Sequence, residues 1–287
     1  MQCMTGIFIR DFYFSPQTFK SLRIRIVFGV KNRGGHVPFH HQHILAQTVK
    51  GILASGGHPI FATSIDFNFS GLKGQTKISR KGLHFYSSKA TLVFSSGDKE
   101  FLDYFSLVLF KQKELMVGNL FLIPESIERE DPVLVTDSQK FLCLSPIVLL
   151  PGAFNDDKSK RFISPVEDEF SDLLYESTLH RMAASKRFTE EQLTGYYKFQ
   201  VVPDKGYLER IESGHKKFAR IYPLFDLDIK YEVRGYTFPF TLYAPDAVQR
   251  FIYESGLGYF SHKGFGMLDI SHSSSIKNMV HEEVVYA

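Results

Sequence analysis

Two halves of this sequence carry the same order of secondary-structure signals: strand, helix, strands, helix, strand. In the first half, "SLRIRIVFGV" (residues 21–30) alternates apolar side chains with Arg23 and Arg25, as a strand with one buried face does. An amphipathic helix is predicted over "PFHHQHILAQTVKGIL" (residues 38–53), with a proline in its first turn. The remaining predicted elements are strands at 64–70 and 82–96, a helix at 98–112 and a closing strand at 115–128.

The second half follows a polar connector, "REDPVLVTDSQ". Its predicted elements are a strand at 141–150, a helix at 164–184, strands at 195–203 and 226–244, a helix at 245–256 and a last strand at 264–271. No sequence repeat relates the two halves, and only the order of elements recurs. That order is the βαββαβ order of a ferredoxin-like unit. The sequence therefore predicts an α+β protein of two tandem ferredoxin-like domains, residues 1–135 and 136–287.

Composition narrows the class of protein. Apolar residues make up 44% and charged residues 23% of the 287 positions, as in an ordinary globular core. No apolar run approaches the ~18 residues of a membrane span, and the N-terminal stretch lacks the pattern of a secretory signal. The two cysteines, Cys3 and Cys143, form no disulfide or metal framework, which fits a reducing compartment. We expect a cytoplasmic protein without membrane contact. The net charge of +3 means that any basic surface is local.

The predicted helix at 38–53 carries a polar stripe. At about 100° per residue, one face presents His40, His43, Gln47 and Lys50, opposite the apolar face. His41 falls toward the apolar side or caps the first turn. Imidazole titrates near neutral pH, so a histidine on this stripe can act as general base or acid. An ammonium group nearby can stabilise negative charge that builds on a phosphate.

Two other interpretations of this stripe stay open. A polar stripe on an amphipathic helix is usually its solvated face. The His40–His43 pair could also chelate a metal ion, but no Asp, Glu or Cys lies nearby in sequence to complete a site. The local additions would be His36 and His58. We expect no metal and no cofactor.

A glycine-rich loop precedes the last predicted strand. "SGLGYFSHKGFGMLDI" (residues 255–270) has two Gly-x-Gly pairs around a polar tip: Gly256, Gly258, His262, Lys263, Gly264 and Gly266. Glycine lets the backbone take a positive φ and approach a ligand closely, and successive free N–H groups form an anion-binding nest. The structural alternative is a tight turn between helix and strand with incidental charges.

A basic segment lies upstream of this loop. "GHKKFAR" (residues 214–220) interleaves Lys216, Lys217 and Arg220 with an aromatic side chain. This pattern is typical of a surface that follows a nucleic-acid backbone and stacks a base.

Taken in order, these segments resemble the CRISPR-associated endoribonucleases that cut precursor CRISPR RNA, within the repeat-associated mysterious protein (RAMP) superfamily. "YESGLGYFSHKGFGMLDI" is similar to that family's C-terminal glycine-rich loop, and "VPFHHQHILAQTVKGIL" to its first-helix block. "FLCLSPIVLL" followed by "ISPVEDEFSDLLYESTLHR" resembles the opening of its second domain. "GYTFPFTLYAPDAVQRFIYESG" resembles the hairpin and helix before the loop. Each motif alone is weak, but the ordered set covers most of residues 21–270.

The resemblance implies two RNA-recognition-like domains and metal-independent cleavage of a CRISPR repeat. The 2′-hydroxyl attacks the adjacent phosphate and leaves a 2′,3′-cyclic phosphate and a 5′-hydroxyl. The implied partners are precursor CRISPR RNA, subunits of a CRISPR effector complex and a second copy of the chain. The implied RNA-binding residues are those of the glycine loop and the basic segment: Gly256, Gly258, His262, Lys263, Gly264, Gly266, Lys216, Lys217 and Arg220.

Active residues of the family lie in or just after the first helix. The catalytic candidates are therefore His43, His40, His41, Lys50 and His58. A late active position of the family, often Tyr, falls on Lys50. The family's frequent Leu-His pair in the following loop has no clean match, and His58 is the nearest candidate. Helical geometry favours His43 or His40 as the base, while the motif also admits His41.

Two rival functions share these features. A non-catalytic RAMP subunit that only holds guide RNA has the same fold and glycine loop but needs no histidine face. A metalloenzyme built on the histidine cluster is the second rival.

Overall fold

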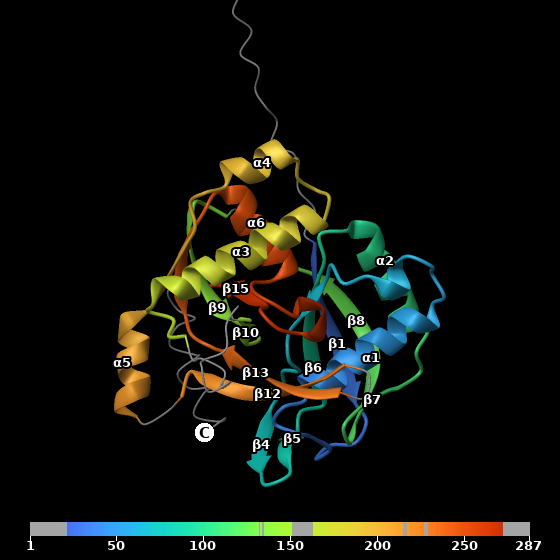
Figure 1. The fold of residues 1–287 in the computed structure, drawn as a ribbon. Helices are drawn as coiled ribbons and strands as arrows, with labels where there is room; N and C mark the ends of the chain where they lie inside the picture. Colours follow the sequence, from blue (N-terminus) through green and yellow to red (C-terminus); the bar gives the residue numbers. More distant parts are fainter. Residues whose placement is uncertain are drawn as a thin grey trace, which may run out of the picture.

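The computed structural model describes residues 22–271 except 132, 134, 151–162, 215–216 and 227–228. Figure 1 shows two domains side by side, with the N-terminal half in blue and green and the C-terminal half in yellow to red. None of the helices in these ranges is long and apolar enough to cross a membrane.

The N-terminal domain is built on a five-stranded antiparallel sheet in the order β3-β6-β1-β8-β7. The chain runs through β1 (Arg23–Val30), β2 (His36–Val37), α1 (Gln42–Ser55), a 3-10 turn (Phe61–Thr63), β3 (Asn68–Phe69), β4 (Thr76–Ser79), β5 (Gly82–Phe85), β6 (Lys89–Ser95), α2 (Lys99–Phe110), β7 (Leu115–Val117) and β8 (Leu120–Arg129). The first strand lies between the third and fourth strands of the predicted unit, which is the ferredoxin-like arrangement. Apolar side chains of α1 and α2 pack on one face of this sheet and form a single core.

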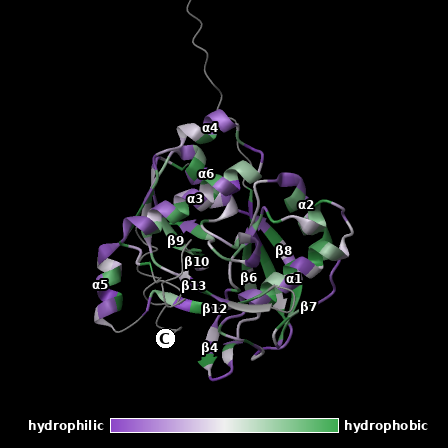
Figure 2. Cartoon of the chain, viewed as in Figure 1, coloured by the Kyte–Doolittle hydropathy of each residue, from purple (hydrophilic) through white to green (hydrophobic). Residues whose placement is uncertain are grey.

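The C-terminal domain repeats this arrangement in a four-stranded sheet of order β11-β14-β9-β15. Its elements are β9 (Ser138–Cys143), β10 (Ile147–Val148), α3 (Asp168–Ala184), α4 (Glu190–Gly195), β11 (Gln200–Pro203), α5 (Lys205–Ser213), β12 (Ala219–Asp226), β13 (Ile229–Tyr236), β14 (Phe240–Tyr243), α6 (Asp246–Ser255), a 3-10 turn (Ser261–Lys263) and β15 (Leu268–Ile270). Helices α3 and α6 contribute Phe170, Leu174, Phe251 and Ile252 to its core. In Figure 2, parts of α4 and α5 are purple, whereas part of β8 is green.

A long hairpin of the C-terminal domain contacts the N-terminal domain. β12 and β13 form a three-stranded sheet with β10, and in Figure 1 they extend from the C-terminal domain toward α1. The predicted domain division between residues 135 and 136 falls between β8 and β9, and it stays a prediction.

One buried arginine also links the domains. The sequence predicted that Arg23 lies on the exposed face of its strand, and this was wrong. Arg23 is 1% exposed, and its Nη1 donates to the carbonyls of Tyr253 at 3.1 Å and Leu268 at 2.7 Å. Its Nε donates to Glu130 at 2.9 Å. The C-terminal domain therefore covers the side of β1 that the alternation marked as polar at Arg23, whereas Arg25 on the same side stays exposed.

Several predicted boundaries shift for local reasons. The closing strand at 115–128 is two strands, because Gly118 turns the chain with φ +60°. The strand at 141–150 ends at Cys143, and its continuation after Pro146 joins a different sheet as β10. Helix α5 was not predicted, although Asp204 caps it through its carboxylate, which accepts from the Tyr207 N–H at 2.8 Å.

Candidate active site

Helix α1 begins four residues later than the sequence predicted. The strand pairing of β2 with β5 keeps the chain extended through Val37, and residues 38–41 then form a turn. The imidazole Nδ1 of His41 donates to the carbonyl of Pro38 at 3.0 Å and closes this turn. His40 therefore precedes the helix and His41 occupies its N-cap position.

His43 sits on the first turn of α1 and is half-buried. Its Nδ1 lies 2.9 Å from the carbonyl of His40, which can only accept, so Nδ1 carries the proton and Nε2 has the free lone pair. Burial lowers the pKa of His43 below 6.5, and the hydrogen bond to His40 opposes that shift. A neutral imidazole with an unprotonated Nε2 is the form that can accept a proton.

His40 lies beside His43 and is also half-buried. Burial lowers its pKa below 6.5, and the nearby charges of Arg220 and His43 lower it further. Its Nδ1 is buried without a hydrogen-bond partner among the described residues. The structure thus brings together two imidazoles and a guanidinium.

The C-terminal domain completes this cluster through β12. The ring of Tyr222 meets His40 edge-on with centroids 5.0 Å apart, and Phe225 packs against His43 at 4.9 Å. The sequence missed this role of β12. The segment "ARIYPLFD" lies almost entirely outside the predicted strands, and its mostly apolar run does not tell which helix it would cover.

His41 is enclosed, unlike the half-buried His40 and His43. It is 7% exposed, and its Nε2 is buried without a hydrogen-bond partner among the described residues. Burial lowers the pKa of His41 to about 4, outweighing the hydrogen bond to Pro38 that raises it. A neutral, enclosed imidazole of this kind supports the helix start.

His58 and Lys50 lie farther along. Lys50 is exposed, and seven residues of helix place it about 10 Å along the axis from His43. His58 follows the end of α1, where its ring stacks on Phe61 at 4.2 Å and its Nδ1 accepts from the Phe61 N–H at 3.1 Å. The structure does not bring His58 to the His40–His43 pair.

The glycine loop adopts the backbone that the sequence predicted, but its glycines are buried. Gly256, Gly258, Gly264 and Gly266 all have positive φ, between +71° and +83°. The N–H groups of Gly256, Gly264 and Gly266 donate to carbonyls within the protein. Most of the N–H groups that were expected to form an anion-binding nest are therefore already hydrogen-bonded within the fold.

This loop is held between the domains. Gln42, beside His43 in sequence, donates through Nε2 to the carbonyl of Gly264 at 2.5 Å. From α3, Arg181 donates to the carbonyls of Ser255, Gly256 and Gly258. The tip is less enclosed: His262 and Lys263 form the 3-10 turn, and the Lys263 ammonium lies 5.5 Å from the Phe260 ring centroid.

The basic segment upstream is described in part. Lys217 and Arg220 are exposed, while Lys216 lies outside the described residues. Arg220 belongs to β12, and its charge acts on His40, which makes it a candidate site residue as well as a candidate RNA contact.

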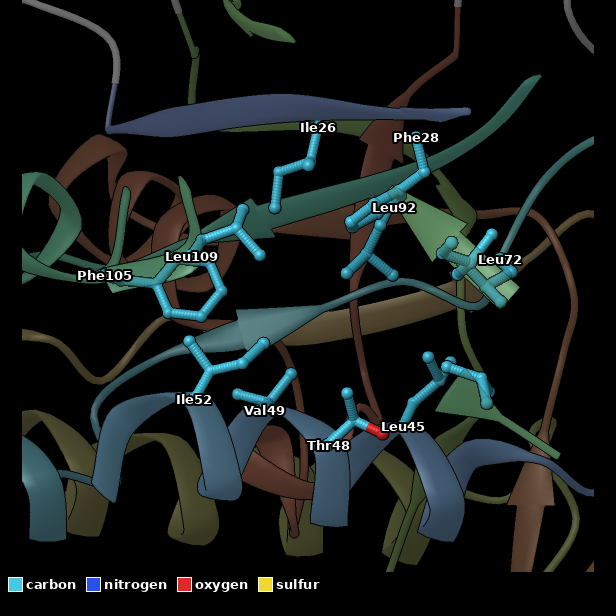
Figure 3. A pocket seen from close by; sticks show the side chains of 12 residues that line it. Ile26, Phe28, Leu45, Thr48, Val49, Ile52, Leu72, Leu92, Phe105 and Leu109 are labelled. Atoms are coloured by element: carbon cyan, nitrogen blue, oxygen red, sulfur yellow. The ribbon is translucent and has the colours of Figure 1, made fainter. Parts of the chain in front are cut away.

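The cavity in the core of the N-terminal domain is not part of the candidate active site. A cavity of about 20 Å³ lies between α1 and the first sheet, and Figure 3 shows it lined by Ile26, Phe28, Leu45, Val49 and other apolar side chains. The hydroxyl of Thr48, which also lines it, donates to the carbonyl of Ile44. With no other polar group in its lining, the space is dry. No group of three His, Cys, Asp or Glu side chains that could hold a metal ion occurs within the described ranges.

Comparisons with known proteins point to one family. Residues 128–270 match the family model described as CRISPR associated protein Cas6, C-terminal. A Pyrococcus furiosus protein described as a CRISPR-associated endoribonuclease-like protein Cas6 is 27% identical over 194 residues, which cover 67% of this chain and 73% of the relative. Residues 128–270 are thus those of a Cas6 C-terminal domain, and the chain as a whole resembles the Cas6 family of CRISPR-associated proteins. The family resemblance predicted from the sequence motifs is confirmed.

Solved structures related to Cas6 share the fold. The product of a Cas6-related gene from Pyrococcus furiosus has a TM-score of 0.72 at 22% identity, covering 88% of this chain and 99% of that one. A RAMP protein described as binding different RNA substrates has a TM-score of 0.71 at 20% identity, covering 87% and 99%. At these identities the likeness concerns the fold, and the predicted tandem ferredoxin-like domains are confirmed.

Proposed function

We propose that this chain binds CRISPR repeat RNA and cleaves precursor CRISPR RNA without a metal ion. The observation that carries the proposal is the His40–His43 pair, two half-buried imidazoles at the contact between α1 and β12 with Arg220 beside them. The relatives support it, since one is described as an endoribonuclease-like protein and another as a product complex of Cas6.

The geometry suits a transesterification. Nε2 of neutral His43 accepts the proton of the 2′-hydroxyl, and the 2′-oxygen attacks the adjacent phosphorus. The bond from phosphorus to the 5′-oxygen breaks, and protonated His40 donates its proton to that leaving oxygen. The products are a 2′,3′-cyclic phosphate and a 5′-hydroxyl. General acid and base steps of this kind each contribute about 10²–10⁴-fold in rate.

Positively charged side chains near the His40–His43 pair stabilise the transition state. The negative charge on the nonbridging oxygens of the phosphate grows in the transition state, and Arg220 stabilises it from β12. Lys50 stabilises the same negative charge from one side of α1. Lys217 and Lys263 hold the RNA farther from the cut. The glycines act by shaping the loop that carries Lys263.

A substrate with one 2′-deoxy sugar at the cut tests this function. Repeat RNA is incubated with the protein in excess chelator, and the same RNA with the single 2′-deoxy substitution runs in parallel. We expect the RNA to be cut and the deoxy substrate to bind and stay intact. Cleavage that is lost in chelator and restored by a divalent metal would refute the metal-independent mechanism. Binding without cleavage under both conditions would instead make the chain a guide-RNA-binding subunit.

A further inference from the structure

The β4–β5 hairpin lies in a basic segment of the N-terminal domain. Residues 67–97 contain five cations and no carboxylate, in a chain with 34 cations and 31 carboxylates. All five are exposed: Lys73, Lys77, Arg80, Lys81 and Lys89. Lys89 pairs with Glu125, whereas the other four form no ion pair with a described carboxylate.

An aromatic side chain lies among these charges. Tyr86, just after β5, is 47% exposed, and the ammonium of Lys77 lies 5.0 Å from its ring centroid. Cationic side chains beside an exposed ring are what a single nucleic-acid strand requires, because phosphates pair with the charges and a base stacks on the ring.

The hairpin is fixed next to the candidate active site. His36 of β2 pairs with His84 of β5, and their rings stack at 5.1 Å. The Nδ1 of His84 donates to the carbonyl of Gly34 at 2.9 Å, and its Nε2 accepts from the Ser79 hydroxyl at 2.7 Å. The chain then passes from His36 to His40 in four residues, a span of at most about 14 Å.

A purely structural role explains some of these charges but not all of them. β4 is an edge strand of the sheet β2-β5-β4, and lysines on an edge strand prevent pairing with another chain. This accounts for Lys77. It does not account for Arg80 and Lys81 at the turn, or for the exposed Tyr86 after the central strand.

We propose that this hairpin is a second RNA-binding surface, which holds single-stranded RNA next to the scissile phosphate. Lys77, Arg80 and Lys81 contact the RNA backbone, and Tyr86 stacks on a base. The identity of the ligand rests on the proposed function, while the surface itself rests on the charge, exposure and position of the hairpin.

The test compares two triple variants that lose the same charge. The hairpin variant is Lys77→Gln/Arg80→Gln/Lys81→Gln. The control variant is Lys111→Gln/Lys113→Gln/Lys198→Gln, which removes three exposed lysines away from the hairpin. Affinity for repeat RNA is measured across a salt series, and the single-turnover cleavage rate is measured at saturating protein. Thermal unfolding confirms that each variant is folded.

Counterion release sets the expected size of the effect. Each contact to a single strand contributes about 0.7 to the log–log salt slope, so three contacts contribute about 2. At 0.15 M salt this corresponds to roughly 50-fold weaker binding for the hairpin variant. The saturated cleavage rate should stay unchanged, and the control variant should keep the wild-type slope. Tyr86→Ala should weaken binding at least about 5-fold with the slope unchanged, and Tyr86→Phe should bind as the wild type does.

The outcomes separate the two proposals. If the hairpin variant keeps the wild-type affinity and slope while the wild type cuts RNA, the hairpin surface is wrong and the proposed function stands. If the salt slope of the hairpin variant falls as expected but neither the wild type nor any variant cuts RNA, the hairpin surface stands and the nuclease function is wrong. A wild type that binds no RNA at any salt concentration overturns both.

Discussion

Replacing Gly266 with alanine should strongly destabilise the fold. Gly266 has φ +71°, and a Cβ there would run into the carbonyl oxygen of Leu257. The left-handed backbone costs an alanine about 1–2 kcal/mol. A backbone shift to relieve the contact would also strain the hydrogen bonds of Gly266 to Pro146 at 2.7 Å and to Leu257 at 2.8 Å, each worth about 1 kcal/mol. The sum is about 3–4 kcal/mol.

Gly57 provides the matched control. It has φ +69°, and a Cβ added there would meet nothing within 4 Å. Gly57→Ala should therefore cost only the backbone term of about 1–2 kcal/mol. Urea unfolding of both variants measures the difference, and the melting temperature of Gly266→Ala should fall by roughly 10 °C. Equal stability of the two variants would refute the claim that the glycine loop is a packed joint between the domains.

Three further predictions follow from the histidines and the loop tip. Because burial lowers the pKa values of both His40 and His43, the pH profile of kcat/KM should peak below pH 6.5, and a peak above pH 7 would contradict the assignment. His41 has a pKa of about 4 when folded and 6.5 when unfolded, so the unfolded chain binds more protons between these values. Stability should thus fall as the pH drops from 6.5 toward 4, by up to about 1.4 kcal/mol per pH unit, and urea unfolding should show a shallower fall for His41→Leu. Lys263→Ala should lower the salt slope of RNA binding by about 0.7, and an unchanged slope would exclude Lys263 as a phosphate contact.

The sequence predicted the fold well because its signals are local. The alternation in residues 21–30 and the apolar faces of the two N-terminal helices depend on residues close in sequence, and the structure has these elements in the predicted order. The structure also confirms the positive φ of the loop glycines, since glycine spacing is itself a local signal.

What the sequence did not reveal depends on contacts between distant segments. Arg23 lies 230 positions from Tyr253, and nothing in its strand indicates that this face would be buried. The contact of Phe225 with His43 likewise arises only once both domains are folded. The helical wheel predicted that His40 and His43 lie together on one face of a helix. The structure does place the two residues together, but His40 lies in the turn before α1, so helical periodicity is not the cause.

The cleavage rate of His43→Ala, measured beside its RNA affinity, tests the central claim most directly. Saturating protein and labelled repeat RNA give the single-turnover rate, and binding is measured in the same buffer. The proposed role of Nε2 as general base predicts a rate about 10²–10⁴-fold below that of the wild type, with little change in affinity. A His43→Ala protein that cuts repeat RNA at the wild-type rate would contradict it.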